Sequence, residues 1–276
     1  MPELHDVALH FDDIEAVDAY TGDYLFKAQF NSFDESSTDG SVERKRTMSA
    51  APNLNLPLRR VIQIFGENWI IGNGNSDGIF NRAIRKNYWL KRADPVMECL
   101  TPGQLLNGLP GFSFHASKHY LKDTVNGVTD SEYDPFWDIF AGINEPILRG
   151  LYLRDRGSLL RVRGAHEELS GFRLAQCDEL DNPAETVLKI VTGKVYDAAT
   201  DREVVTTADV PAIVMDAYKL YRYATKADVK MNAGDLTAVI AVEPVIGTEV
   251  VTSSGSYRVR GVQPELDAWM IHLVKP

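Results

Sequence analysis

The chain has 276 residues, of which 44% are hydrophobic and 25% are charged, and its formal net charge at pH 7 is -10. Such a chain buries a hydrophobic core without covalent staples and corresponds to about two average domains. The acidic balance argues against a protein whose surface as a whole binds nucleic-acid phosphates, although it is compatible with a local basic face.

Two features of the sequence concern its compartment. Cys99 and Cys177 lie outside any Cys-x-x-Cys pattern, so we expect both to be reduced and buried. Residues 1–10 lack the basic start and apolar run of a signal peptide, and no stretch approaches the roughly 20 apolar residues that span a bilayer. We therefore expect the protein to be made and kept in a cytoplasm.

Residues 1–56 are expected to form an N-terminal arm and a long polar loop. Phe11, Ile14 and Val17 recur at helical spacing among acidic residues, which fits either a short amphipathic helix or an acidic arm. A strand is expected at residues 24–28.

The segment of residues 31–50 is polar and runs into three consecutive basic residues, Arg44, Lys45 and Arg46. Its apolar content is too low to pack alone, so it is interpreted as a long loop or the tip of an extended hairpin. The basic triplet is either solvated or in contact with nucleic acid or the acidic face of a neighbouring subunit. We count it among the candidate interface residues.

A β module is expected at residues 57–100. Its alternating apolar residues and its Gly- and Asn-rich turns are typical of a small barrel or sandwich. Strands are predicted at residues 59–65, 69–72 and 85–90, with turns at residues 66–68 and 73–78.

The middle of the chain, residues 101–144, is expected to be a mixed connecting region. Residues 133–140 are dense in aromatic side chains, which are either core residues or anchors of a subunit contact. Phe136 and Trp137 are the candidate interface residues of this region.

Two segments of the chain resemble one another. Residues 157–164 read Gly-Ser-Leu-Leu-Arg-Val-Arg-Gly, and residues 255–261 read Gly-Ser-Tyr-Arg-Val-Arg-Gly. Arg163 and Arg260, both candidate interface residues, are 97 positions apart, and a one-residue slip separates the Gly-Ser match from the Arg-Val-Arg-Gly match. The pattern predicts a duplicated β-hairpin, with a looser third copy around residues 61–72.

The repeat divides the rest of the chain. Residues 145–182 are expected to form a β-hairpin unit and residues 183–276 a C-terminal barrel-like module. In that module Ile213 and Val214 begin an apolar face at helical spacing, which predicts a helix at about residues 211–223. The predicted fold is mainly β with minor α, built of small and possibly duplicated β-barrel or sandwich modules with extended loops and arms.

The end of the chain carries a pattern of three segments: Gly234-Asp235-Leu236-Thr237, Gly255-Ser256-Tyr257-Arg258-Val259 and Trp269-Met270-Ile271-His272-Leu273. With it the sequence resembles the head-completion and head-tail joining (stopper) proteins of tailed bacteriophages, which are small β-barrels. Residues 44–50, ahead of residues 57–61, are also similar to phage neck proteins.

The resemblance implies a structural protein of the virion that forms a cyclic homo-oligomeric ring between the portal and the tail. Its expected partners are copies of itself, portal or adaptor proteins, and tail proteins, with incidental contact to packaged DNA in the lumen. The resemblance brings no catalytic residues and no cofactor.

The sequence contains only weak signals for a catalytic or metal-binding site. His115 and His119 have the i, i+4 spacing that could share a metal on a helix, but no third ligand is evident nearby. Residues 73–78 lack the alternating carboxylates and the terminal Glu of a calcium loop, and the sequence has neither a phosphate-binding P-loop nor a nucleophile elbow. We expect no enzyme, metal or cofactor.

Two alternatives come from other classes of protein. A virion receptor- or carbohydrate-binding module could stack sugars on its tryptophans, Trp69, Trp89, Trp137 and Trp269. A metal-dependent hydrolase would use His115 and His119.

Overall fold

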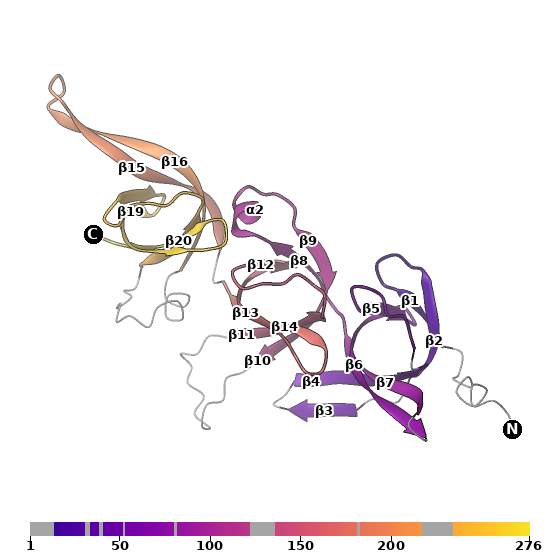
Figure 1. Cartoon of the computed structure of the whole chain (residues 1–276). Coiled ribbons are helices and arrows are strands. Elements are labelled where there is room, and N and C mark those ends of the chain that lie inside the picture. Colours follow the sequence, from indigo (N-terminus) through magenta and orange to yellow (C-terminus); the bar gives the residue numbers. More distant parts are fainter. Residues whose placement is uncertain are drawn as a thin grey trace. The chain divides into compact units, whose positions relative to one another are not determined.

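The computed structural model describes residues 14–30, 34–38, 41–51, 53–79, 82–121, 136–180, 183–216 and 234–276 (Figure 1). These residues are almost entirely β-strand, and the helix described among them, α2 (Pro102–Leu106), is short. The predicted mainly β fold of small barrels is confirmed. The chain forms two compact units, of residues 1–98, 113–149 and 162–177, and of residues 99–112, 150–161 and 178–276.

The first sheet contains β1 (Ile14–Asp18), β2 (Tyr24–Phe30), β3 (Asp34–Thr38), β4 (Ser41–Ala50), β5 (Val61–Ile64), β6 (Glu67–Ile79) and β7 (Arg82–Arg92). Its order is β2-β1-β5-β6-β7-β4-β3, and a further pairing of β2 with β4 closes six of the strands into a barrel. β3 pairs with β4 outside that closure.

The second sheet contains β8 (Val96–Leu100), β9 (Phe112–His115), β10 (Ser117–Leu121), β11 (Phe136–Gly142), β12 (Tyr152–Asp155), β13 (Ser158–Glu167) and β14 (Phe172–Glu179). Its order is β10-β11-β14-β13-β12-β8-β9. Only Ala116 separates β9 from β10, so one nearly continuous run of chain supplies both edges of the sheet.

The third sheet contains β15 (Ala184–Asp197), β16 (Arg202–Asp216), β17 (Leu236–Ile240), β18 (Glu249–Thr252), β19 (Gly255–Pro264) and β20 (Trp269–Val274). It is a closed barrel in the order β15-β16-β17-β20-β19-β18. β15 and β16 are much longer than their neighbours and extend past the barrel as a hairpin (Figure 1).

The three sheets share one connectivity. Starting from the first strand of each, the order is β1-β5-β6-β7-β4-β2 in the first sheet and β15-β18-β19-β20-β17-β16 in the third. In the second it is β8-β12-β13-β14-β11-β10, with β9 on the other side of β8, so β9 and β10 together take the place of β2 and of β16. We call these strand sets repeat 1 (residues 14–92), repeat 2 (96–179) and repeat 3 (184–274).

The hairpins singled out by the sequence are equivalent in all three repeats. Each has a four-residue strand (β5, β12 or β18), a two-residue turn and a longer second strand, and the turns are closed by the pairs Ile64–Glu67, Asp155–Ser158 and Thr252–Gly255. The first two turns, Phe65-Gly66 and Arg156-Gly157, have positive φ at both residues, as a tight hairpin turn requires.

The pairing also corrects the sequence alignment of the last two hairpins. Tyr152 pairs with Arg161 and Glu249 pairs with Arg258, so the two hairpins correspond at a constant offset of 97. The predicted one-residue slip is therefore wrong. Ser158, not Gly157, corresponds to Gly255, because the turn in the second hairpin is Ser253-Ser254.

In the first compact unit, strands of repeat 1 are buried on both faces, one inside the barrel and one outside it. The barrel interior is filled by large side chains that include Trp69, Met48 and Leu90. On the outside of the same strands, Val61 and Ile70 pack against side chains of repeat 2, namely Phe140, Phe172 and Leu174. Because alternate residues of a strand point to opposite faces, the run Trp69-Ile70-Ile71 serves both cores.

The second compact unit repeats this arrangement with repeat 3. Leu188, Ile240 and Leu273 lie inside the barrel. Outward-facing side chains of β16, β17 and β20 pack against side chains of repeat 2, in a cluster that includes Met215, Val239, Met270, Leu105, Tyr152, Leu159 and Leu180.

Three local predictions are wrong. Residues 211–216 end strand β16 and are not the start of a helix, because Ile213 and Val214 pair with neighbouring strands on both sides; residues 217–223 lie outside the described residues. Residues 73–78 belong to β6 and are not a turn. Of the two forms predicted around Phe11, Ile14 and Val17, the helix is wrong for residues 14–18, which are strand β1, while residues 1–13 lie outside the described residues.

Other local predictions are confirmed. The segment of residues 31–50 contains the hairpin β3–β4, which was one of its two predicted forms. The strands predicted at residues 24–28, 69–72 and 85–90 lie within β2, β6 and β7. Both cysteines are buried thiols. Among the described residues, no helix has the length and apolar character of a membrane-spanning segment.

Candidate functional site

The candidate functional surfaces are two equivalent junctions, one in each compact unit. In each, the turn that joins the last two strands of a repeat docks on the preceding repeat. We call these turns docking tips: the β13–β14 tip is residues 168–171, and the β19–β20 tip is residues 265–268. Both tips begin with Glu-Leu, which the sequence already showed at an offset of 97.

The β13–β14 tip lies against β6 of repeat 1. The Asn73 amide N–H donates to the Ser170 carbonyl at 2.6 Å, and the Asn73 side chain donates to the Leu169 carbonyl at 3.3 Å. A Cβ on Gly72 would lie 2.4 Å from the Ser170 carbonyl oxygen, so only glycine allows this approach. The tip is thus joined to β6 by backbone contact.

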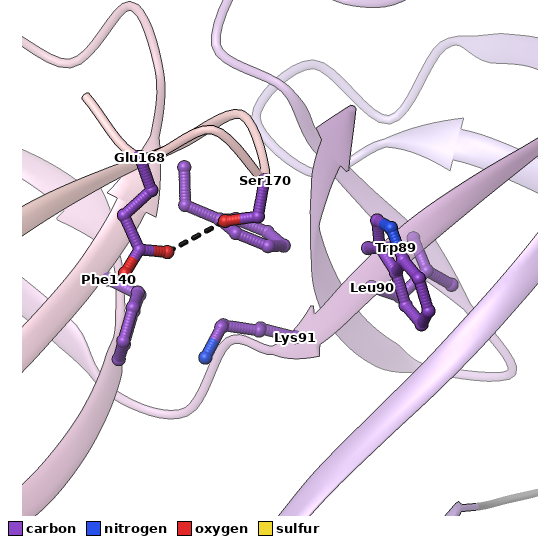
Figure 2. Close-up of a pocket in the computed structure, with 7 residues that line it drawn as sticks. Trp89, Leu90, Lys91, Phe140, Glu168 and Ser170 are labelled. Atoms are coloured by element: carbon purple, nitrogen blue, oxygen red, sulfur yellow. Dashed lines mark hydrogen bonds between the residues drawn. The ribbon is translucent and has the colours of Figure 1, made fainter. Parts of the chain in front are cut away.

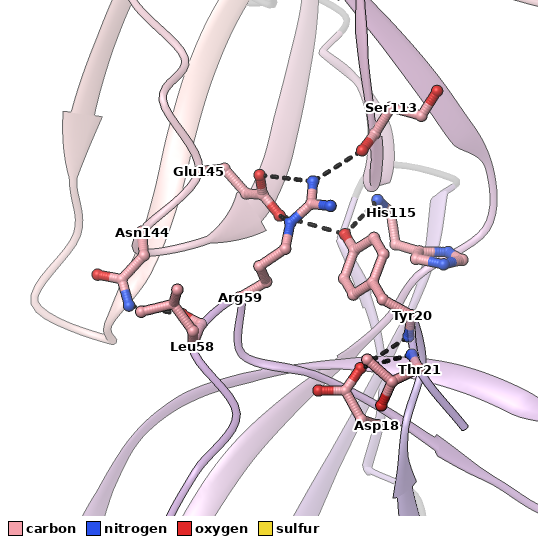
Figure 3. Close-up of polar contacts among 9 residues, drawn as sticks. All are labelled: Asp18, Tyr20, Thr21, Leu58, Arg59, Ser113, His115, Asn144 and Glu145. Carbon is pink, nitrogen blue, oxygen red and sulfur yellow. Dashed lines mark hydrogen bonds and ion pairs between the residues drawn. The ribbon is translucent and has the colours of Figure 1, made fainter. Parts of the chain in front are cut away.

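A buried ion pair strengthens the same junction (Figure 3). Arg59, just before β5, donates to Glu145 from Nε at 2.8 Å and from Nη2 at 2.9 Å, and its Nη2 also donates to the Ser113 carbonyl at 2.7 Å. The Glu145 side chain is 1% exposed. A bidentate pair of this kind fixes orientation as well as distance.

Tyr20 completes the network from the connection between β1 and β2. Its ring lies 3.8 Å from the Arg59 guanidinium, and its hydroxyl donates to Glu145 at 3.2 Å while it accepts the His115 backbone N–H at 3.1 Å. Burial, helped by the Glu145 charge, raises the pKa of Tyr20 to about 12. The hydroxyl therefore stays protonated and remains a donor throughout the physiological range.

The second junction uses the same parts of the fold. Arg161 of β13 donates to Glu265 of the β19–β20 tip at 2.6 Å, with side chains 9% and 2% exposed. Asp267 of the tip accepts the Thr101 hydroxyl at 2.6 Å and the Gly103 amide at 2.8 Å, both from the connection between β8 and β9. A Cβ on Gly150, just before β12, would lie 3.3 Å from Leu266.

We call the surface that receives a docking tip the acceptor surface. In repeats 1 and 2 it has three parts. These are the connection after the first strand, the residue two positions before the hairpin (Arg59 or Gly150), and the second hairpin strand (β6 or β13). In repeat 3 the first residue of the hairpin is Glu249, where repeats 1 and 2 have Val61 and Tyr152. Its partner on the second strand is the exposed Arg258, where repeats 1 and 2 have Ile70 and Arg161.

A pocket of about 390 Å³ lies within the first compact unit (Figure 2). Its lining residues are Trp89, Leu90, Lys91, Phe140, Glu168, Ser170 and Phe172. The ammonium of Lys91 is 3.4 Å from the centre of the Phe140 ring, and Ser170 donates to Glu168 at 2.7 Å. Trp89 is 43% exposed at this site, so the pocket offers a wall of aromatic rings around a cation.

The raised pKa of Asp138, on β11, leads to a prediction about the pH dependence of stability. Burial, followed by the charge of Glu168, raises the pKa of Asp138 from 3.8 to about 6, and its buried Oδ1 has no hydrogen-bond partner among the described residues. A raised carboxyl pKa favours the folded state at low pH, and this contribution is lost as pH rises through about 6. Asp138→Asn is therefore expected to gain stability relative to the wild type between about pH 4 and pH 7, measured as the difference in Tm.

The matched control for that experiment is Asp209→Asn, at an exposed position on β16. Its Tm difference from the wild type is expected to stay flat across the same pH range. A flat difference for Asp138→Asn as well would contradict the assignment.

The structure places the sequence-predicted interface residues on different strands. Arg46 of β4 lies with its guanidinium 5.0 Å from the centre of the Trp69 ring, and Trp137 of β11 lies 4.2 Å from the Lys118 ammonium. Arg163 is half-buried on β13 and Arg260 is exposed on β19. The side chains of Arg44, Lys45 and Phe136 lie outside the described residues, and the interface role of the set stays a prediction.

The two candidate metal ligands lie on strands and not on one helix. His115 of β9 stacks edge-on with Tyr20, and His119 of β10 stacks edge-on with Phe140. Within the described part of the chain, no three His, Cys, Asp or Glu side chains come together as a metal site would require.

The residues that the sequence did not reveal are those of the junctions, Arg59, Glu145, Arg161 and Glu265 among them. The only signal was the paired Glu-Leu of the two docking tips. Comparison with protein-family models found no match, and comparisons with curated proteins and with solved structures found no significant match.

Proposed function

We propose that this protein is a structural subunit of the neck of a tailed bacteriophage, a non-enzymatic ring component that joins the head to the tail. The observation that carries the proposal is the position of the three segments that resemble stopper proteins. They lie at the start of β17, on β19 and on β20, and the order β17-β20-β19 makes these strands neighbours in one closed six-stranded barrel. A small closed barrel is the fold that the resemblance implies.

The junctions support the same proposal. The ion pairs of Arg59 with Glu145 and of Arg161 with Glu265 join one repeat to the next. Within each compact unit, such an ion pair therefore fixes one repeat against the next. A particle component needs such rigidity, because many weak contacts add up around a ring only when each subunit holds its shape.

Disruption of the gene in its source genome tests the proposal. We expect DNA-filled heads without tails in electron micrographs of the lysate, and restoration of tailed particles when the gene is supplied in trans. Supply of a variant that carries an early stop codon is the matched control. Tailed, infectious particles in the absence of the protein would overturn the proposal.

A receptor- or carbohydrate-binding module is the second candidate, and one observation favours it: Trp89 is exposed beside the pocket of Figure 2. Trp69, by contrast, is buried in the barrel core and cannot stack on a sugar. Selective binding on a glycan array that is lost in Trp89→Ala would favour this candidate over the neck subunit.

A further inference from the structure

We infer that the pocket of about 390 Å³ in the first compact unit binds one neutral sugar unit in its pyranose form. Trp89 is the platform on which the sugar stacks, and Glu168 and Lys91 are its hydrogen-bond partners. The inference rests on the carbohydrate-binding candidate of the proposed function, for which it names the ligand class and the residues of the site. It does not depend on the neck proposal.

Strand β7 supplies the platform and the cation of the pocket. Alternate residues of a strand point to opposite faces, so the Leu90 side chain lies in the barrel core while Trp89 and Lys91 share the outer face. Two residues of strand span about 7 Å, which allows one ligand to lie on Trp89 and reach Lys91 with a hydroxyl. Trp89 is 43% exposed, so much of its indole is open to that ligand.

Repeat 2 holds the cation in place. The rings of Phe140 and Phe172 meet edge to face with their centres 6.3 Å apart. The Lys91 ammonium lies 3.4 Å from the centre of the Phe140 ring and 5.5 Å from that of Phe172 (Figure 2). Cation–π contacts with two rings orient the ammonium before a ligand arrives, so binding does not have to order a long flexible side chain.

Glu168 supplies the acceptor, and it is also held in advance. Its Oε2 accepts the Ser170 hydroxyl at 2.7 Å, its backbone N–H donates to the Phe172 carbonyl at 2.9 Å, and its carbonyl accepts the Gly171 N–H at 2.8 Å. A carboxylate has about four lone-pair sites, so Glu168 can accept hydroxyl groups of a ligand in addition to that of Ser170. Neighbouring hydroxyls of a sugar suit such an acceptor.

The charges of the pocket favour a neutral ligand. Lys91 and Glu168 are the charged residues of its lining, and their charges cancel. The titratable groups near them, Asp138 and His166, add no net positive charge at neutral pH, so a ligand anion gains little. A hydroxyl donates to a carboxylate and accepts from an ammonium, so one polyhydroxylated ring satisfies both residues.

The size of the pocket limits the ligand further. Its volume is at the lower end of the range of about 300–1,000 Å³ that small-molecule sites occupy. One sugar unit, with its apolar face on Trp89 and its hydroxyls toward Glu168 and Lys91, fits this volume and this lining.

Titration of the full-length protein with methyl pyranosides, followed by ligand-observed NMR, tests the inference. The neutral probes are the methyl glycosides of glucose, mannose and galactose, and the charged comparison is the methyl glycoside of glucuronate. We expect at least one neutral probe to bind more tightly than the glucuronate, and Trp89→Ala to weaken that binding by about tenfold. Tyr120→Ala is the matched control, because it removes a ring of equal exposure, 44%, on β10 and should leave binding unchanged.

Glu168→Gln is the second variant, since it keeps the shape of the side chain and removes its charge. We expect it to weaken the neutral probe several-fold, because hydrogen bonds to a carboxylate are stronger than those to an amide. An unchanged Tm shows that the variant is folded. Absence of binding by every neutral probe, tighter binding of the glucuronate, or equal losses in Trp89→Ala and Tyr120→Ala would overturn the inference.

The other experiments separate this failure from that of the proposed function. Glycan-array binding that survives Trp89→Ala would retain the carbohydrate-binding candidate and reject this pocket as its site. The gene disruption tests the neck proposal by itself, because neither of its outcomes changes the affinity of the pocket for a pyranoside.

Discussion

Glu265→Ala is expected to lower the free energy of unfolding by about 3–5 kcal/mol, the range found when one partner of a buried ion pair is removed. The Arg161 side chain is 9% exposed and would lose the carboxylate that it contacts, keeping its charge next to the buried Tyr152 with Asp178 as a further acidic neighbour. The loss should appear in denaturant titration of the second compact unit, as a lower midpoint with little change in slope.

The control for this experiment is Glu249→Ala. Glu249 pairs with Lys194 at 3.0 Å, but both side chains are substantially exposed, so removal of the pair should cost less than about 1 kcal/mol. Glu265→Leu adds a second comparison, because it fills the space that Glu265→Ala leaves empty and still removes the carboxylate that Arg161 contacts. If Glu265→Ala cost no more than Glu249→Ala, the second junction would not contribute to stability.

Arg59→Ala is the second large effect, with an expected loss of about 2–4 kcal/mol in the first compact unit. It leaves the Glu145 carboxylate buried with the Tyr20 hydroxyl as its remaining donor. The expected loss is smaller than for Glu265→Ala because the Arg59 side chain is 33% exposed, so water can enter the vacated space. The midpoint of denaturant unfolding measures it.

Arg59→Lys distinguishes charge from geometry. An ammonium keeps the charge but cannot make the bidentate contact or stack flat on Tyr20, so we expect it to recover less than half of the loss. Arg92→Ala is the control, because Arg92 pairs with Asp94 and Glu67, whose side chains are far more exposed than that of Glu145. Full recovery by Arg59→Lys would show that position 59 needs only a positive charge.

The sequence was most informative where contacts are local. A hairpin joins residues that are close along the chain, and its turn residues carry their own backbone preferences, so the hairpins at residues 61–72, 157–164 and 255–261 were recognisable. Small barrels were predicted as a class, but their strand order was not, because the closure of β2 on β4 and of β15 on β18 depends on pairing between distant segments.

The errors have the same origin. Ile213 and Val214 satisfy helical spacing, but β-branched residues also suit a strand that is paired on both sides, and here the neighbouring strands decide the conformation. Lys91 illustrates the limit for the site. Nothing in a basic strand sequence shows that this ammonium lies buried against Phe140, some fifty positions away.

The constant offset between the second and third hairpins has an evolutionary consequence. From Tyr152 and Glu249 through the docking tips, corresponding positions of the two segments are always 97 residues apart. An in-frame crossover between these segments would therefore exchange whole hairpins without changing the pairing of their strands. The gene could therefore lengthen or shorten by one barrel in a single recombination event.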